Sequence, residues 1–258
     1  MGERTMIVGA QMFTLREYAK TTEDLSESLK KVADMGYRSV QLSGVCEYEA
    51  EWMKEELRKN GLTCSVTHTK PDKILADVEQ VCRDHKTIGC NKVGIGMMPG
   101  KVSDETYAQF VADFSEPIRK IHDLGMKFFY HNHQIEFVRN RDGKLFIDQL
   151  CEDFAPEYLG ITFDTYWAQF AGCDPAAWLY RLKGRVECVH LKDMIAVGKE
   201  HIMMPVGSGN MNFERILQAA ADVGTEHVIV EQDHCYDEDP FDCLKKSLDY
   251  LRACGLSD

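Results

Sequence analysis

Apolar and polar residues follow a repeating pattern along the chain: an amphipathic helical stretch, a glycine, two or three further residues, and then a short apolar run. The stretches KKVADMGYRSVQLSG and RKIHDLGMKFFYHNH are two examples. Each glycine stands where a helix commonly ends in a left-handed residue, a conformation that glycine adopts without steric cost. The pattern therefore predicts helix ends at six glycines: Gly36, Gly61, Gly89, Gly125, Gly184 and Gly224.

The short apolar runs predict eight strands that alternate with helices. Short apolar strands separated by helices of ten or more residues are typical of parallel pairing. Eight such units that close on themselves form a TIM (β/α)8 barrel, which we expect as a single α/β domain over residues 1–258. An open doubly wound sheet is the alternative, but no G-x-G-x-x-G motif follows the first strand. The predicted strands lie near residues 7–12, 38–43, 62–67, 91–96, 126–131, 159–163, 186–190 and 228–231.

Composition narrows the possible partners and the compartment. The net charge is −12 and no basic patch is evident, so we expect neither nucleic acid nor an anionic membrane surface as a partner. The apolar runs are far shorter than a membrane span. The ten cysteines include no C-x-x-C pair, and the N-terminal stretch has no long apolar segment. These features predict reduced, buried thiols and a cytoplasmic protein.

Ionisable residues follow the last four predicted strands, where a TIM barrel builds its active site. Asp164 ends the sixth strand, His190 the seventh and Glu231 the eighth. Any one of them alone is more often a helix cap, a salt-bridge partner or a core histidine. Together they predict a shared site for a divalent ion, because carboxylate and imidazole groups suit Mn²⁺, Mg²⁺, Co²⁺ or Zn²⁺. Polar residues at other strand ends are Gln11, Gln41, His68, His131, His133, Glu136, Lys192 and Asp233.

Six motifs taken together resemble the xylose isomerase-like TIM-barrel superfamily, and within it the sugar phosphate isomerase/epimerase group. They are GAQMFTLRE, YHNHQIEF, FDTYWAQFAGCDP, VHLKD, PVGSGNMNF and VEQD. The resemblance implies a metal site with a Glu-Asp-His-Glu ligand set, in which Asp164, His190 and Glu231 match the last three ligands. Glu136 is the favoured fifth-strand ligand, with His131 and His133 as alternatives, and Mn²⁺ is the favoured ion.

The resemblance implies an isomerase or epimerase that acts on a ketose or keto-sugar, a small-molecule substrate. The metal would bind the substrate carbonyl and stabilise the enediolate formed when the neighbouring C–H is deprotonated. Proton transfer is assigned to Glu136, Glu231, His133 and His131. Lys192 either binds a substrate oxygen or pairs with Asp164 or Glu231. Further substrate contacts are expected from three residues at the ends of other strands: Gln11, His68 and Trp167.

Other interpretations remain open at this point. A lyase on the same scaffold, either an inosose dehydratase or an enzyme that eliminates the aglycone of a 3-keto-glycoside, begins with the same proton abstraction. A non-catalytic sugar-binding or partner subunit is a lesser alternative, and an endonuclease is disfavoured by the net charge. The glycines at 207 and 209 form either an anion-binding loop or a turn that Asn212 follows as a helix N-cap. A homo-oligomer is possible.

Overall fold

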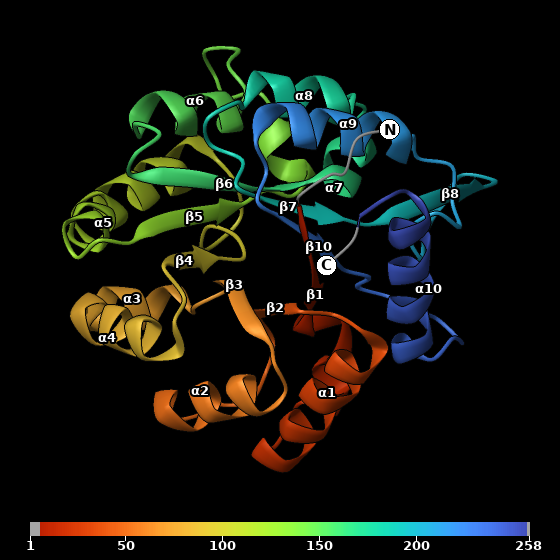
Figure 1. Cartoon of the computed structure of the whole chain (residues 1–258). Coiled ribbons are helices and arrows are strands. Elements are labelled where there is room, and N and C mark those ends of the chain that lie inside the picture. Colours follow the sequence, from red (N-terminus) through yellow and green to blue (C-terminus); the bar gives the residue numbers. More distant parts are fainter. Residues whose placement is uncertain (1–5, 257–258) are drawn as a thin grey trace.

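The protein was analysed as a computed structural model that describes residues 6–256 (Figure 1). The first five and last two residues of the predicted domain lie outside the described residues.

Eight parallel strands form one sheet, in the order β3-β2-β1-β10-β7-β6-β5-β4. The sheet curls into a nearly closed barrel, which confirms the predicted TIM-barrel fold and all eight predicted strands. Within residues 6–256 no ladder of hydrogen bonds joins β3 to β4, although Thr69 N donates to Gly94 O at 2.7 Å across this gap. The strands are β1 (Ile7–Gln11), β2 (Ser39–Leu42), β3 (Thr63–Thr67), β4 (Lys92–Ile95), β5 (Lys127–His131), β6 (Leu159–Asp164), β7 (Cys188–Leu191) and β10 (His227–Val230).

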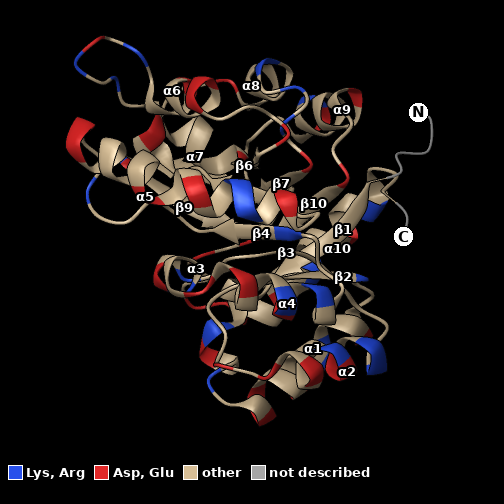
Figure 2. Cartoon of the chain, turned by 90° about the vertical axis from the view of Figure 1, so that its left-hand side faces the viewer, with Lys and Arg blue, Asp and Glu red and all other residues tan. Residues whose placement is uncertain are grey.

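Helices surround the strands on the outside (Figure 1). All six glycines predicted at helix ends have positive φ angles. Acidic and basic residues are interspersed along the outer helices on the face seen in Figure 2. No helix in the described part of the chain is long and apolar enough to cross a bilayer. The helices are η1 (Met12–Tyr18), α1 (Thr22–Met35), α2 (Ala50–Lys59), α3 (Pro71–Ala76), α4 (Val78–Ile88), α5 (Asp104–Asp123), η2 (Gln134–Phe137), α6 (Phe146–Asp153), α7 (Thr165–Phe170), α8 (Pro175–Arg181), α9 (Phe213–Val223) and α10 (Pro240–Ala253).

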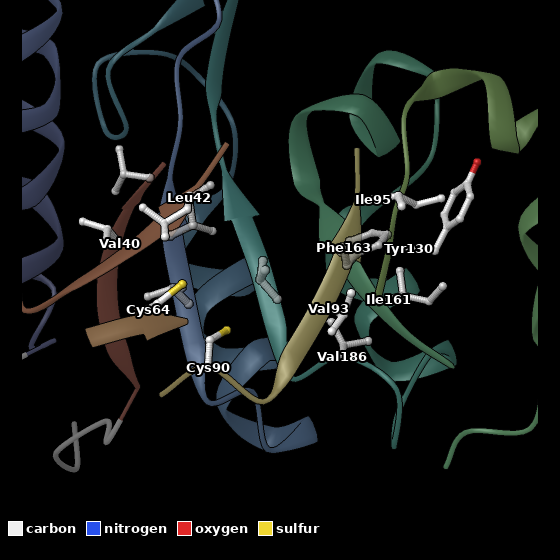
Figure 3. Packing of buried hydrophobic residues seen from close by; sticks show 14 of the residues in the cluster. Val40, Leu42, Cys64, Cys90, Val93, Ile95, Tyr130, Ile161, Phe163 and Val186 are labelled. Atoms are coloured by element: carbon white, nitrogen blue, oxygen red, sulfur yellow. The ribbon is translucent and has the colours of Figure 1, made fainter. Parts of the chain in front are cut away.

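Two apolar layers hold this architecture together. The larger one lies between the strands and the outer helices, and Figure 3 shows part of it around Val93, Ile95 and Ile161. The smaller one lies within the barrel and consists of Val66, Phe129, Cys188 and Ile229. A Cβ atom at Gly160 would lie 2.4 Å from the Phe129 ring, so glycine is what gives this ring its space. The smaller cluster forms an apolar floor beneath the C-terminal ends of the strands, which we call the mouth of the barrel.

A two-stranded antiparallel hairpin, β8 (Asp193–Val197) and β9 (Glu200–Met204), follows β7 and was not predicted from the sequence. Its Met194 and Met203 side chains pack against Tyr166 at the start of α7. The hairpin therefore covers part of the mouth beside α7.

Candidate metal centre at the barrel mouth

Four buried side chains from neighbouring strands converge at the mouth: His131 at the end of β5, Asp164 at the end of β6, His190 in β7, and Glu231 directly after β10. One potential ligand atom from each lies within 4.8 Å of those from the others. Asp164 and His190 are direct partners in the ladder between β6 and β7. Strand register therefore brings these residues together, as the sequence predicts for Asp164, His190 and Glu231.

Asp164 combines the two roles that its sequence position suggests. Its Oδ1 atom accepts a hydrogen bond from Trp167 N at 2.9 Å and so caps α7. Its Oδ2 atom lies 3.2 Å from His131 Nε2 and 3.6 Å from His190 Nδ1. The buried Asn132 side chain accepts a hydrogen bond from Asp164 N at 3.0 Å, which fixes the backbone that carries this carboxylate. One carboxylate oxygen thus belongs to the helix and the other to the site.

Each of the two histidines has an outer ring nitrogen, which points away from the cluster, and an inner one, which points into it. The outer nitrogens donate hydrogen bonds, and this determines whether the inner nitrogens carry a proton or a lone pair. His131 Nδ1 lies 2.9 Å from the carbonyl oxygen of Gly96, and His190 Nε2 lies 2.6 Å from Gln41 Oε1. Because these two oxygens only accept, each outer nitrogen must hold a proton. In a neutral ring the inner nitrogen then presents a lone pair. His131 Nε2 faces Asp164 Oδ2 in this way, and His190 Nδ1 faces Glu231 Oε2 at 2.9 Å.

Lys192 supplies the single ammonium group of the cluster. Its Nζ lies 3.0 Å from Asp164 Oδ2, 2.8 Å from Glu231 Oε2 and 2.8 Å from Asp233 Oδ2. Burial opposes the lysine charge, but the three carboxylates outweigh it and raise the pKa of Lys192. Leaving the histidines aside, three carboxylates and one ammonium group give this upper ion cluster (Asp164, Lys192, Glu231 and Asp233) a net charge of −2. Burial opposes a charge on His190, but Glu231 and Asp164 outweigh it and raise the pKa of this ring.

The residues present fit a divalent cation. His190 Nδ1 and Glu231 Oε2 are both buried, and neither makes a hydrogen bond of normal geometry within residues 6–256. Burial lowers the pKa of His131, which favours a neutral ring with a lone pair on Nε2. An excess of buried negative charge is stabilised by positive charge among the carboxylates, which a divalent ion or a protonated His190 would supply. Two imidazoles and two carboxylates match the donors that Mn²⁺, Co²⁺ and Zn²⁺ accept.

Glu136, the favoured fifth-strand ligand in the sequence analysis, is not part of this convergent group. Its Oε1 accepts a hydrogen bond from Tyr130 Oη at 2.7 Å, and its Oε2 accepts one from His133 N at 2.6 Å. Both oxygens therefore serve to hold η2 against β5. Burial raises the pKa of Glu136 to about 7. His131, one of the alternatives at this position, takes the place beside Asp164 instead.

The remaining predicted residues also lie around the mouth. The ring of His133 lies 4.6 Å from that of His131 and 5.4 Å from that of Trp167, and burial lowers the pKa of His133 to about 3. The ring of His68 lies 5.1 Å from that of His131, and its Nδ1 contacts Ser43 Oγ at 3.1 Å. Buried nitrogen atoms without a hydrogen-bond partner in the described chain include Gln11 Nε2, Gln41 Nε2, His68 Nε2, His133 Nδ1 and Trp167 Nε1.

The glycine loop at residues 207–209 does not offer its amides to an external anion. Gly207 N and Gly209 N donate to Asp193 Oδ2 at 3.0 and 2.9 Å, and Met211 N donates to Asp193 Oδ1 at 3.2 Å. A Cβ atom at Gly209 would lie 2.4 Å from Asp193 Oδ1, so only glycine allows this approach. Asn212 caps α9 by accepting from Arg215 N. Of the two sequence interpretations, the turn followed by an N-cap is the one observed.

Sequence reasoning missed the role of Asn132, and it placed Asp193 at the strand ends without its contact to the glycine loop. Asn132 stands between two histidines, and nothing in its neighbourhood signals a bond to Asp164, which is 32 residues away. Asp193 follows Lys192 and looks like another site carboxylate, but it folds back onto the glycine loop. The motif PVGSGNMNF is the only sequence signal for this contact, because its glycines expose backbone amides that need an acceptor.

Comparison with known proteins agrees with this fold. Residues 29–254 match the family model of the xylose isomerase-like TIM barrel. Two curated relatives are inosose dehydratases, from Geobacillus kaustophilus (31% identical, over 36% of this chain and 30% of the relative) and Geobacillus thermodenitrificans (27% identical, over 52% and 50%). The chain therefore spans half or less of these relatives. A sugar phosphate isomerase/epimerase from Parabacteroides distasonis has the same fold, with a TM-score of 0.81, 21% identity, and coverage of 96% of this chain and 94% of that one.

Proposed function

The chain belongs to the xylose isomerase-like TIM-barrel family, and from this premise we propose that it is a divalent-metal-dependent isomerase or epimerase of a ketose or keto-sugar. One observation carries the proposal. The inner nitrogens of His131 and His190 face carboxylate oxygens inside a buried cluster whose net charge is −2. A purely structural cluster would gain nothing from this uncompensated charge, because burying unpaired charge is strongly unfavourable.

We assign the metal ligands to His131, Asp164, His190 and Glu231, with Mn²⁺ as the ion. This set replaces Glu136 with His131, because both oxygens of Glu136 are already hydrogen-bonded elsewhere. When bound, such an ion supplies Lewis-acid polarisation of a carbonyl oxygen, which makes the neighbouring C–H more acidic.

The chain's own residues then have separate tasks. His133 keeps a neutral ring with an unpartnered Nδ1 atom beside His131, so we assign to it the removal of the substrate proton. His133 holds the proton after abstraction, and we assign its return to carbon to the same ring. His68 has the second unpartnered imidazole nitrogen near His131, and we assign to it a contact with a substrate oxygen. Lys192 holds the three carboxylates in place and reduces their mutual repulsion. Trp167, 5.4 Å from the Lys192 ammonium group, closes the site on the side of α7.

A dehydratase is the second candidate, because both curated relatives described above are inosose dehydratases. It would begin with the same proton abstraction by His133. The two reactions diverge afterwards: an isomerase or epimerase returns a proton to carbon, whereas a dehydratase protonates a departing hydroxyl group. Product analysis separates them.

Metal content of the purified protein tests the proposal. We expect a stoichiometric divalent ion in the wild type, and at least a hundredfold weaker Mn²⁺ binding in Asp164→Asn and Glu231→Gln, because each removes a charged ligand. Glu187→Gln, a carboxylate at the opposite end of the barrel, is the matched control and should bind metal normally. Loaded wild type should then exchange substrate C–H for solvent deuterium in keto-sugars or inososes.

Two results would contradict the proposal. A wild type that binds no divalent ion, even after incubation with Mn²⁺ or Co²⁺, would remove its basis. A metal-loaded protein that binds these sugars but never exchanges or converts them would instead indicate a non-catalytic sugar-binding subunit.

A further inference from the structure

Two buried glutamine side chains stand next to each other at the ends of β1 and β2. Gln11 and Gln41 are direct partners in the parallel ladder between these strands, and neither side chain is exposed. Register partners in a sheet project to the same face. Because Gln41 reaches His190 on β7, this face is the barrel interior, beside the upper ion cluster.

The structure places the oxygen of each amide group against a neighbour within the protein. Gln11 Oε1 accepts a hydrogen bond from Phe13 N at 3.3 Å, and a backbone N–H can only donate. Gln41 Oε1 lies 2.6 Å from His190 Nε2. Both oxygens are thus committed within the protein. Both Nε2 atoms are buried and have no hydrogen-bond partner among residues 6–256. A pair of buried NH₂ groups without hydrogen-bond partners is unfavourable unless another group accepts hydrogen bonds from them.

The charge of the surroundings defines what can fill this role. Gln11 and Gln41 are neutral donors, while the upper ion cluster carries three carboxylates against one ammonium group. The proposed divalent ion would balance that excess, and the two amides carry no charge of their own, so nothing in this wall would pair with an anionic oxygen. The amide-lined wall therefore favours an uncharged acceptor oxygen.

We propose that the amide groups of Gln11 and Gln41 form a two-donor subsite that binds an uncharged hydroxyl or keto oxygen of the substrate, and that Gln41 also positions His190. The inference deepens the proposed function and rests on it for the identity of the substrate as a polyhydroxylated ketone. Gln41 connects the subsite to the metal centre, because the oxygen of the same amide accepts a hydrogen bond from His190 Nε2. Gln11 has no such link, since its oxygen holds the start of η1.

This difference between two adjacent glutamines makes the test specific. Gln11→Met and Gln41→Met keep the side-chain length but remove the donor, and Gln149→Met, on α6, is the control. Binding of Mn²⁺, and of an inosose and a ketohexose as probes, is measured by calorimetry with metal-free and metal-loaded protein. We expect both mouth variants to bind the probes about 10- to 100-fold more weakly. Only Gln41→Met should also weaken Mn²⁺ binding, by about tenfold.

Monodeoxy analogues of the probe that binds identify the oxygen. The wild type should lose affinity for one analogue by the same factor that the glutamine variants lose for the parent, and the variants should not discriminate between the two. Gln11→Asn and Gln41→Asn, which keep the amide but withdraw it, replace any methionine variant that fails to fold.

Unchanged probe affinity in both mouth variants would overturn the subsite while leaving the metal proposal intact. Equal Mn²⁺ affinity in Gln41→Met and the wild type would overturn the positioning role of Gln41. Absence of Mn²⁺ binding by the wild type would overturn the proposed function. The subsite then stands only if the metal-free wild type binds a probe and the variants bind it more weakly.

Discussion

The barrel carries an ion cluster at each end, and the two differ in charge balance and in access to water. The lower ion cluster lies at the N-terminal ends of the strands and contains Lys92, Lys127, Glu187 and Glu226. Its two lysines match its two glutamates, and the Glu226 side chain is 54% exposed. The upper ion cluster has two more carboxylates than ammonium groups, and its Asp164 and Lys192 side chains are at most 1% exposed.

This difference is what we expect between charges that only stabilise the fold and charges that serve the proposed metal site. A balanced, partly hydrated set of ion pairs contributes modestly to stability and needs no further partner. A dry set with excess negative charge is costly unless a cation joins it. Both clusters consist of ordinary charged residues at strand ends, so residue type alone does not distinguish them. The balance of charge and the exposure of the partners do.

The largest effect on this contrast is expected from Lys192→Met in metal-free protein. The substitution leaves the buried Asp164 and Glu231 and the partly exposed Asp233 without their ammonium partner, and should lower the free energy of unfolding by about 3–5 kcal/mol. Chemical unfolding in the presence of a chelator measures it. Loss below about 1 kcal/mol would show that the upper ion cluster is hydrated or protonated without metal, and would weaken the contrast.

Glu136 belongs to neither ion cluster: it is a buried carboxyl group whose partners among residues 6–256 are the Tyr130 hydroxyl and a backbone N–H group. Its pKa is about 7 in the folded protein and near 4.5 when exposed. The folded state therefore keeps a proton that the unfolded state releases, so this group lowers stability as pH rises from about 5 to 8, by about 3 kcal/mol. Glu136→Gln should remove this part of the pH dependence. Parallel pH profiles for the two metal-free proteins would show that Glu136 titrates normally.

The smallest effect is expected at the lower ion cluster. Lys92→Met should cost only about 1 kcal/mol, because Glu226, its nearest partner at 2.9 Å, is half-exposed and regains water. Near 1 M salt, where charges are screened beyond about 3 Å, the cost should fall further. Unfolding of this variant at low and high salt, beside Lys192→Met, tests whether the two clusters differ as described. Equal losses of unfolding free energy in the two variants would contradict the proposed difference between the two ion clusters.

Much of the site could be predicted because it depends on strand ends. Asp164, His190 and Glu231 each follow an apolar run, and consecutive parallel strands bring such positions together. The barrel itself was predictable for the same reason, since each strand after β1 is preceded by a glycine-terminated helix or a short turn. These features depend on residues close together in the sequence.

The fifth-strand position could not be decided in this way. Glu136 lies five residues beyond His131, and its direction depends on the backbone turn into η2 and on the Tyr130 hydroxyl that accommodates it. The Asp193 contact with Gly207 and Gly209, and the β8–β9 hairpin between them, depend likewise on contacts between residues distant along the chain. Charge and spacing in the sequence carry no record of such contacts.

The missing ladder between β3 and β4 makes the barrel a split ring. All other neighbouring strands of the barrel are joined by hydrogen-bond ladders, so the barrel is open at this one gap among the described strands. Here β5, β6, β7 and β10, the strands that carry or directly precede His131, Asp164, His190 and Glu231, are joined by unbroken hydrogen-bond ladders. The four converging side chains are therefore carried by strands joined without a break, and the gap falls between β3, which His68 follows, and β4.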